Sequence, residues 1–163
     1  MIAGAEIKIE AKKLECLSTP VIKQEGSNAI VTGTLKFSEL TVKKPAGCMT
    51  APSLTTKPVT AKIYEEGPTV YERFEPTAGP PERFVIFPLT GCAAEGEYPI
   101  KGTVFGRSAN ATGTEAANQP LTFSETIQKT AGGSLTAGTN PAQLSGKAND
   151  ELISGSEFGV SES

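Results

Sequence analysis

The sequence contains no histidine and no tryptophan, and Asp150 is its single aspartate. Without histidine, neither a Ser–His nor a Cys–His nucleophile pair can form, and zinc sites lose their usual nitrogen ligand. One aspartate cannot supply a calcium loop, which gathers several Asp or Asn side chains in a short segment. The glycine-rich nucleotide-binding motifs and the GxSxG motif of serine hydrolases are also missing. We therefore predict a protein that is not an enzyme and has no catalytic residues, metal site or cofactor.

Long apolar runs and concentrations of positive charge are missing too. No run approaches the roughly 18 apolar residues of a membrane-spanning helix. The 15 Lys and Arg residues are scattered along the chain, and the formal net charge is −3. Nucleic-acid-binding domains are instead basic, with Lys and Arg clustered on one face. We expect neither a membrane span nor a nucleic-acid partner.

Glycine and proline, by contrast, are frequent in this chain of 163 residues, with 17 and 12 copies. Both residues interrupt helices and favour turns. The hydrophobic fraction of 37% is modest, but a chain of this length can still bury a core. These features indicate a single β-rich domain over residues 1–163.

Alternation of apolar and polar residues is the main pattern along the chain. Ile7 and Ile9 alternate with charged residues, and the pattern slips by one position at Lys12–Lys13, which predicts a β-bulge. The run 84–89 is apolar on both faces and suits a strand between two layers. We predict an all-β fold, a two-layer antiparallel β-sandwich, with a closed β-barrel as the alternative. The predicted core consists of Ile7, Ile9, Leu14, Leu35, Phe37, Ile63, Phe84, Ile86, Val104, Phe105, Leu121 and Phe123.

The C-terminal segment 129–163 is rich in Gly and Ser and repeats an aliphatic residue, a hydroxyl residue and a glycine. The three units are 135–138, 144–146 and 153–155. We interpret the segment as a β-meander of short strands or as an edge segment of the domain. No part of the chain shows the 3.6-residue periodicity of a helix.

Three cysteines, Cys16, Cys48 and Cys92, leave at least one thiol outside any disulfide within the chain. The residues alone do not decide between one disulfide with one buried thiol and three buried thiols.

Aromatic side chains offer a candidate ligand site. Sugar-binding modules often stack a ring on Trp or Tyr, and Tyr64, Tyr71 and Phe74 could together form such a platform. Alternating aromatic residues in strands are, however, more often part of the core.

Several segments together resemble a known group of proteins. They are 33–37, 45–48, 55–61, 91–92, 98–106 and 135–158, so the resemblance covers most of the chain. They resemble secreted β-rich proteins that soil actinobacteria of the Solirubrobacter type encode in many copies, with no known activity. The resemblance implies a secreted or cell-surface protein. Because the first residues lack the basic and apolar pattern of an export signal, we expect that such a signal has been removed.

The resemblance also bears on the cysteines. Members often carry a cysteine shortly after the Phe-rich strand, where this chain has Leu40, and that cysteine would be the partner of the one matching Cys48. The resemblance therefore implies that Cys48 is the free thiol and that Cys16 and Cys92 form the disulfide. Cys48–Cys92 is the next candidate.

Two functions remain under consideration. The first is a non-enzymatic structural or interaction protein of the cell surface, which binds itself or other surface proteins through the edges of its sheets. Its candidate edges are the N-terminal strand 6–16 and the C-terminal tail. The alternative is a monomeric β-sandwich binding module for a polysaccharide or a small ligand, which would use the aromatic platform.

Overall fold

The computed structural model describes residues 6–17, 21–25, 28–79, 81–111, 113–151 and 156–157, with the backbone alone for 21–25, 28–29 and 151. Strands make up most of this part of the chain. In chain order they are β1 Lys8–Glu10, β2 Lys13–Cys16, β3 Val21–Glu25, β4 Asn28–Gly33, β5 Leu35–Ser38, β6 Thr41–Lys44, β7 Ser53–Thr55, β8 Val59–Glu66, β9 Thr69–Pro76, β10 Arg83–Leu89, β11 Gly96–Lys101, β12 Val104–Ser108, β13 Asn118–Phe123, β14 Thr136–Ala137, β15 Asn140–Pro141 and β16 Gly146–Glu151.

The first six strands form one long, interrupted hairpin. The chain runs out through β1, β2 and β3 and returns through β4, β5 and β6, so that β3 pairs with β4, β2 with β5 and β1 with β6. Regular pairing stops between β1 and β2, where the Lys12 amide reaches Ser38 O at 3.2 Å. The predicted β-bulge at Lys12–Lys13 is nevertheless wrong, because Glu10 pairs with Thr41 and Lys13 with Ser38 in the same register, and the register shift lies between Lys8 and Ile9. On the returning strand, Glu39 has a left-handed φ of 54°. These interruptions let one hairpin contribute to three sheets.

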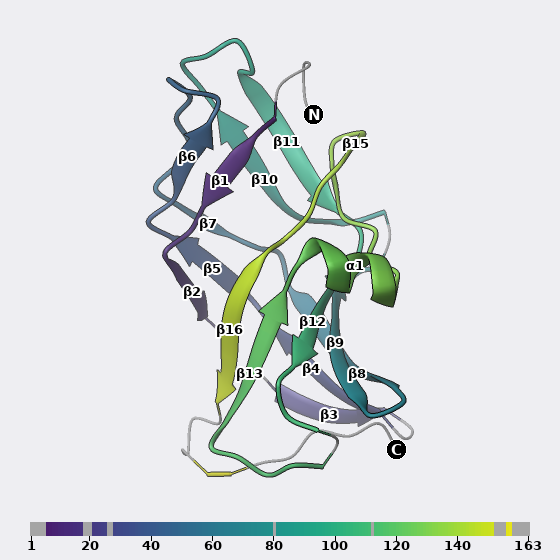
Figure 1. Cartoon of the computed structure of the whole chain (residues 1–163). Coiled ribbons are helices and arrows are strands. Elements are labelled where there is room, and N and C mark those ends of the chain that lie inside the picture. Colours follow the sequence, from purple (N-terminus) through teal and green to yellow (C-terminus); the bar gives the residue numbers. More distant parts are fainter. Residues whose placement is uncertain are drawn as a thin grey trace.

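The largest sheet has seven antiparallel strands in the order β16-β13-β12-β9-β8-β4-β3. It curves through the lower half of the molecule in Figure 1. Because side chains alternate between the two faces of a strand, one face collects apolar residues from successive strands. These buried residues are Val59, Val70, Val104, Leu121 and Phe123. In the described part of the chain β3 and β16 do not pair, so the sheet is open and is not a closed barrel.

The smaller sheets pack against this apolar face. They have the strand orders β10-β11-β14-β15 and β2-β5-β7. Val59 of the large sheet packs with Phe84 and Val85 of β10, and partly buried residues of β5, β7 and β11 surround this cluster. A second cluster, built on Val104, Leu121 and Phe123, continues the core along the large sheet. The predicted all-β sandwich is therefore confirmed.

A short helix, α1 (Glu125–Ala131), is present although no helix is predicted from the sequence. Ser124 caps its start, since the Ser124 Oγ accepts a hydrogen bond from the Ile127 N–H at 3.2 Å. Gly132, with a φ of 80°, ends it in the left-handed conformation. Seven residues are too few to establish a helical period, so the two caps are the sequence signal for this element.

The C-terminal segment does not form a single meander. Strands β14 and β15 make a small hairpin on the four-stranded sheet, whereas β16 pairs with β13 as an edge strand of the large sheet. The third expected unit, 153–155, lies outside the described residues.

Candidate functional site

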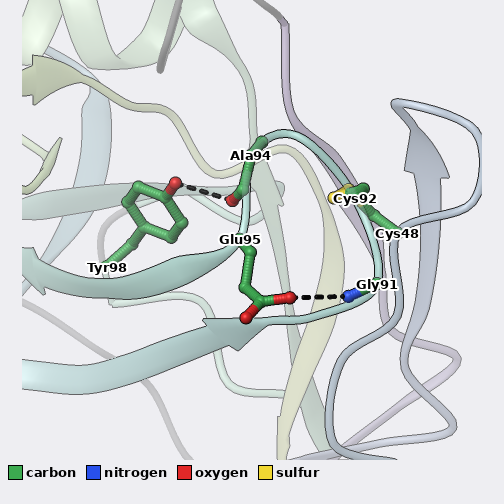
Figure 2. Close-up of a disulfide and its surroundings, with 6 residues drawn as sticks. All are labelled: Cys48, Gly91, Cys92, Ala94, Glu95 and Tyr98. Atoms are coloured by element: carbon green, nitrogen blue, oxygen red, sulfur yellow. Dashed lines mark hydrogen bonds between the residues drawn. A yellow bond between two sulfur atoms is a disulfide. The ribbon is translucent and has the colours of Figure 1, made fainter.

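One disulfide joins Cys48 to Cys92, with 4.9 Å between their Cα atoms (Figure 2). The expected Cys16–Cys92 pairing and the expected single thiol at Cys48 are therefore wrong. The reason lies in the backbone next to Cys48, because Met49 and Thr90 exchange two hydrogen bonds of 2.9 and 3.0 Å. The Met49–Thr90 backbone pair brings the connection between β6 and β7 against the turn between β10 and β11. Cys16 lies on β2, is exposed and is not disulfide-bonded.

Hydrogen bonds within the turn that carries Cys92 fix its shape. The Gly91 N–H donates to Glu95 Oε2 at 3.1 Å, and the Tyr98 hydroxyl donates to Ala94 O at 2.7 Å (Figure 2). Gly91 has a φ of 77°, a conformation that glycine adopts without steric cost. The disulfide thus links the β6–β7 connection covalently to the β10–β11 turn.

The aromatic residues of the predicted ligand platform do not share a surface. Tyr64 and Tyr71 are opposite each other on β8 and β9 and contact Phe105, but Tyr71 is only 6% exposed. Phe74 lies three positions beyond Tyr71, so it faces the other side of the sheet, where it packs against Phe123 at a ring-centroid distance of 5.8 Å. The platform prediction is wrong because its members belong to two faces and are mostly core residues.

Gln128 attaches helix α1 to the backbone of β12 in the large sheet. The Phe105 N–H donates to Gln128 Oε1 at 2.9 Å, and Gln128 Nε2 donates to Phe105 O at 2.6 Å. The β12–β13 ladder pairs Arg107 with Thr122 and Ser108 with Leu121, further along β12. At Phe105, therefore, a side-chain amide takes the place of the neighbouring strand's backbone.

Glu72 and Asp150 form a carboxyl pair on the inner face of the large sheet. Glu72 of β9 is 6% exposed, Asp150 of β16 is half-buried, and their side chains are hydrogen-bonded. Burial raises the pKa of Glu72 well above its ordinary value, and the nearby Asp150 carboxyl raises it further. Burial also raises the pKa of Asp150, although the hydrogen bond from Glu72 acts in the opposite direction. Glu72 therefore holds the proton, and its O–H donates a hydrogen bond to the Asp150 carboxylate.

The neighbours of the pair explain why it is not neutralised by a cation. Strand register places the following uncharged residues on its face, together with the carboxylate of Glu65: Ile63, Val70, Phe74, Gly106, Ser108, Gln119, Leu121 and Ala148. The basic residues of these strands have the opposite parity and face outward; they are Lys62, Arg73, Arg107 and Lys147. Gln119 itself is fully buried, with its amide bonded to Asn110 Nδ2 at 2.7 Å and to Thr114 O at 3.0 Å.

The carboxyl pair does not line either of the two surface hollows described for the structure. One, of about 290 Å³, lies around Glu82, Arg83 and Lys101, and the other, of about 220 Å³, lies beside Arg107 and Ile127. General acid–base catalysis needs the acid within hydrogen-bond reach of a substrate. The pair is instead an internal contact that fastens the edge strand β16 to β9, across β13 and β12. Neither Glu72 nor Asp150 is a predicted site residue, although Glu72 has the same strand parity as Val70 and Phe74.

The outer edge of the N-terminal strands is open. In the described chain β1, β2 and β3 each end a sheet. Leu14 of β2 is 40% exposed, so its assignment to the core is wrong. It nevertheless belongs to the apolar face, because it is directly opposite Phe37, which is opposite Leu54. Leu14 is exposed because no described strand lies beyond β2 to cover it.

Charged residues also lie along these N-terminal strands. Exposed ion pairs join Glu6 to Lys44 at 2.8 Å, Glu10 to Lys43 at 3.0 Å and Lys12 to Glu39 at 3.7 Å. On β2, Lys13 and Glu15 are on the polar face, 3.9 Å apart. Exposed pairs such as these contribute at most about 1 kcal/mol each to stability. On β2 the polar face therefore presents a positive charge at Lys13 followed by a negative charge at Glu15.

The described residues contain no group of three or more His, Cys, Asp or Glu side chains that could hold a metal ion. They also include no helix with the length and apolar character needed to cross a membrane. Comparison with known family models, with curated proteins and with solved structures found no match.

Proposed function

We propose that this chain is a non-enzymatic structural protein of the cell surface or extracellular space that associates through the open edge of β2, with copies of itself or with other surface proteins. The observation that carries the proposal is Leu14, an apolar residue on the core-facing side of β2 that is 40% exposed at the sheet edge. A further strand beside β2 would cover it.

The backbone of β2 is oriented to accept such a strand. The Leu17 N–H donates to Thr34 O at 2.8 Å, so this pair is hydrogen-bonded. In an antiparallel ladder, hydrogen-bonded and non-hydrogen-bonded pairs alternate, so Glu15 and Lys13 also bond to β5. The N–H and C=O of Leu14 then point away from β5, toward the open edge. An added strand gains backbone hydrogen bonds there as well as apolar contact.

Two of the other sheet edges, β15 and β16, are less suited to pairing. Strand β15 is two residues long and contains Pro141, which has no N–H to donate. Strand β16 carries Asp150 on its inner face, and an inward charge discourages an additional strand. The Cys48–Cys92 disulfide supports an extracellular setting, because disulfides persist in oxidising compartments.

Sedimentation velocity over a range of concentrations tests the proposal. The wild-type chain is expected to associate reversibly, and Leu14→Lys is expected to abolish association because it places a charge on the apolar face of the edge. Met49→Lys is the matched control, since Met49 is 61% exposed on the disulfide-bonded loop and not on β2. Association that survives Leu14→Lys, or a wild-type chain that stays monomeric at every concentration, would contradict the proposal.

A further inference from the structure

We infer that the strand that pairs with β2 is β2 of a second copy of this chain, antiparallel and related by a two-fold axis through Leu14. This inference rests on the proposed function, because it uses the same open edge. It adds the identity of the partner and the register of pairing.

The backbone restricts the registers that two β2 strands can adopt. The alternation that follows from the Leu17–Thr34 hydrogen bond directs the backbone groups of Leu14 and Cys16 outward. Two symmetric arrangements place Leu14 opposite one of these outward-directed residues. In one, Leu14 is opposite Leu14 of the second copy; in the other, Leu14 is opposite Cys16 and the axis passes through Glu15.

The charges on the polar face select the first arrangement. With Leu14 on the axis, Lys13 of each copy is directly opposite Glu15 of the other. Since Lys13 and Glu15 are already 3.9 Å apart within one copy, the four charges alternate in sign around a square. With the axis at Glu15, two glutamates would be opposite each other, and like charges in that position are destabilising.

The apolar face favours the same arrangement. Leu14 would contact Leu14 of the second copy and continue the row that Phe37 and Leu54 form across β5 and β7. The contact would cover side chains that are now exposed to water at the edge. The result is a continuous six-stranded sheet in the order β7-β5-β2-β2-β5-β7 across the two copies.

Charge reversal with mixing tests the register. Lys13→Glu alone places two glutamates opposite each other across the axis, and Glu15→Lys alone places two lysines opposite each other. Each variant should therefore weaken self-association by about tenfold or more. An equimolar mixture of the two variants restores opposite charges at both positions and should associate as the wild-type chain does. Lys36→Glu is the control, because Lys36 lies on the same face but one strand further in, on β5.

Cysteine cross-linking provides a second readout. In a Cys16→Ser background, Leu14→Cys should form a disulfide between two copies under mild oxidation, because hydrogen-bonded antiparallel pairs have Cα atoms about 5.5 Å apart. Glu15→Cys in the same background should cross-link much less. A preference for position 15 would overturn the register and select the alternative arrangement.

The outcomes separate this inference from the proposed function. If the wild-type chain associates and Leu14→Lys abolishes association, but the charge-reversed variants behave like wild type and their mixture shows no recovery, the register is wrong while the edge function stands. If the wild-type chain is monomeric at every concentration, both fail. Recovery in the mixture, which neither variant achieves alone, supports the inference and excludes misfolding of the variants as the cause.

Discussion

Replacement of Glu72 by glutamine should stabilise the protein at neutral pH and flatten the pH dependence of its stability. The pKa of Glu72 is raised chiefly by burial and then by Asp150, and the pKa of Asp150 is raised by burial. The folded state therefore binds more protons than the unfolded state between the ordinary carboxyl pKa values and the raised ones. In that window the free energy of unfolding falls as pH rises, by up to about 1.4 kcal/mol per pH unit for each group.

The stabilising contribution of this pair to the free energy of unfolding is fully present below the ordinary carboxyl pKa values of about 4, where both side chains are protonated in the folded and the unfolded state. It is lost as pH rises through the raised pKa values. Glutamine at position 72 can still donate a hydrogen bond to Asp150 without holding a titrating proton. At pH 8 the variant should therefore have a higher free energy of unfolding than the wild-type chain. Compensation by a nearby cation is weak, because among the described side chains of this sheet Glu65 is the other titratable group on this face, while Lys62, Arg73 and Arg107 face outward.

Urea denaturation from pH 4 to pH 8 at constant ionic strength measures the effect. Glu75→Gln is the matched control, because Glu75 lies on the same strand and pairs with Lys62 at 3.5 Å and with Arg73 at 2.7 Å on the outer face. It should not raise the free energy of unfolding at pH 8. If Glu72→Gln lowers stability at pH 8, or if its pH profile is parallel to that of wild type, Glu72 does not hold the proton of the pair in the folded state.

Three further predictions concern stability and can be measured by chemical denaturation under non-reducing conditions. Loss of the disulfide in Cys48→Ser/Cys92→Ser should lower the free energy of unfolding by about 4 kcal/mol, because the cysteines are 44 positions apart and closing a loop of that length removes much entropy from the unfolded chain. Cys16→Ser is the control and should change stability by less than about 0.5 kcal/mol. A loss of about 4 kcal/mol in Cys16→Ser would contradict the Cys48–Cys92 pairing. Gln128→Ala should lower the free energy of unfolding by about 2–4 kcal/mol, since it leaves the buried Phe105 N–H and C=O without partners. Lys129→Ala, at an exposed neighbouring position, is the control. Equal effects of the two substitutions would show that the hydrogen bonds of the Gln128 amide do not stabilise the fold. Gly106→Ala should cost about 1–3 kcal/mol, because its Cβ would lie 2.9 Å from the Phe123 ring; combination with Phe123→Leu should give a smaller loss than the sum of the two single changes, and strict additivity would show that this contact is not the cause.

The strands could be predicted from the sequence because each needs only local alternation. The alternation around Ile9 and Leu14 is enough to place β1 and β2, but it puts the β-bulge at Lys12–Lys13, whereas the register shift lies between Lys8 and Ile9. Alternation does not say whether a neighbouring strand exists, so Leu14 could be assigned to the apolar face but not recognised as exposed. Burial at an edge depends on the sheet order, which is a property of the whole chain.

The disulfide and the carboxyl pair depend on contacts between residues far apart in sequence. Cys48 meets Cys92 because Met49 pairs with Thr90, and no local pattern records that bridge. Glu72 and Asp150 meet because β9 and β16 are held in one sheet by two strands between them. Strand parity alone could have separated Tyr71 from Phe74 and placed Glu72 on the inner face. The partner of Glu72 could not have been found in this way.

Residue-resolved amide hydrogen exchange of β2 at low and high protein concentration shows whether a second strand pairs with its open edge. The Leu14 N–H faces the open edge and has no acceptor on β5, whereas the Glu15 N–H bonds to β5 within one chain. We predict that exchange at Leu14 slows markedly as concentration rises, while exchange at Glu15 is already slow and changes little. If the protein associates but Leu14 exchanges at the same rate at both concentrations, pairing does not occur at this edge, and the account is wrong.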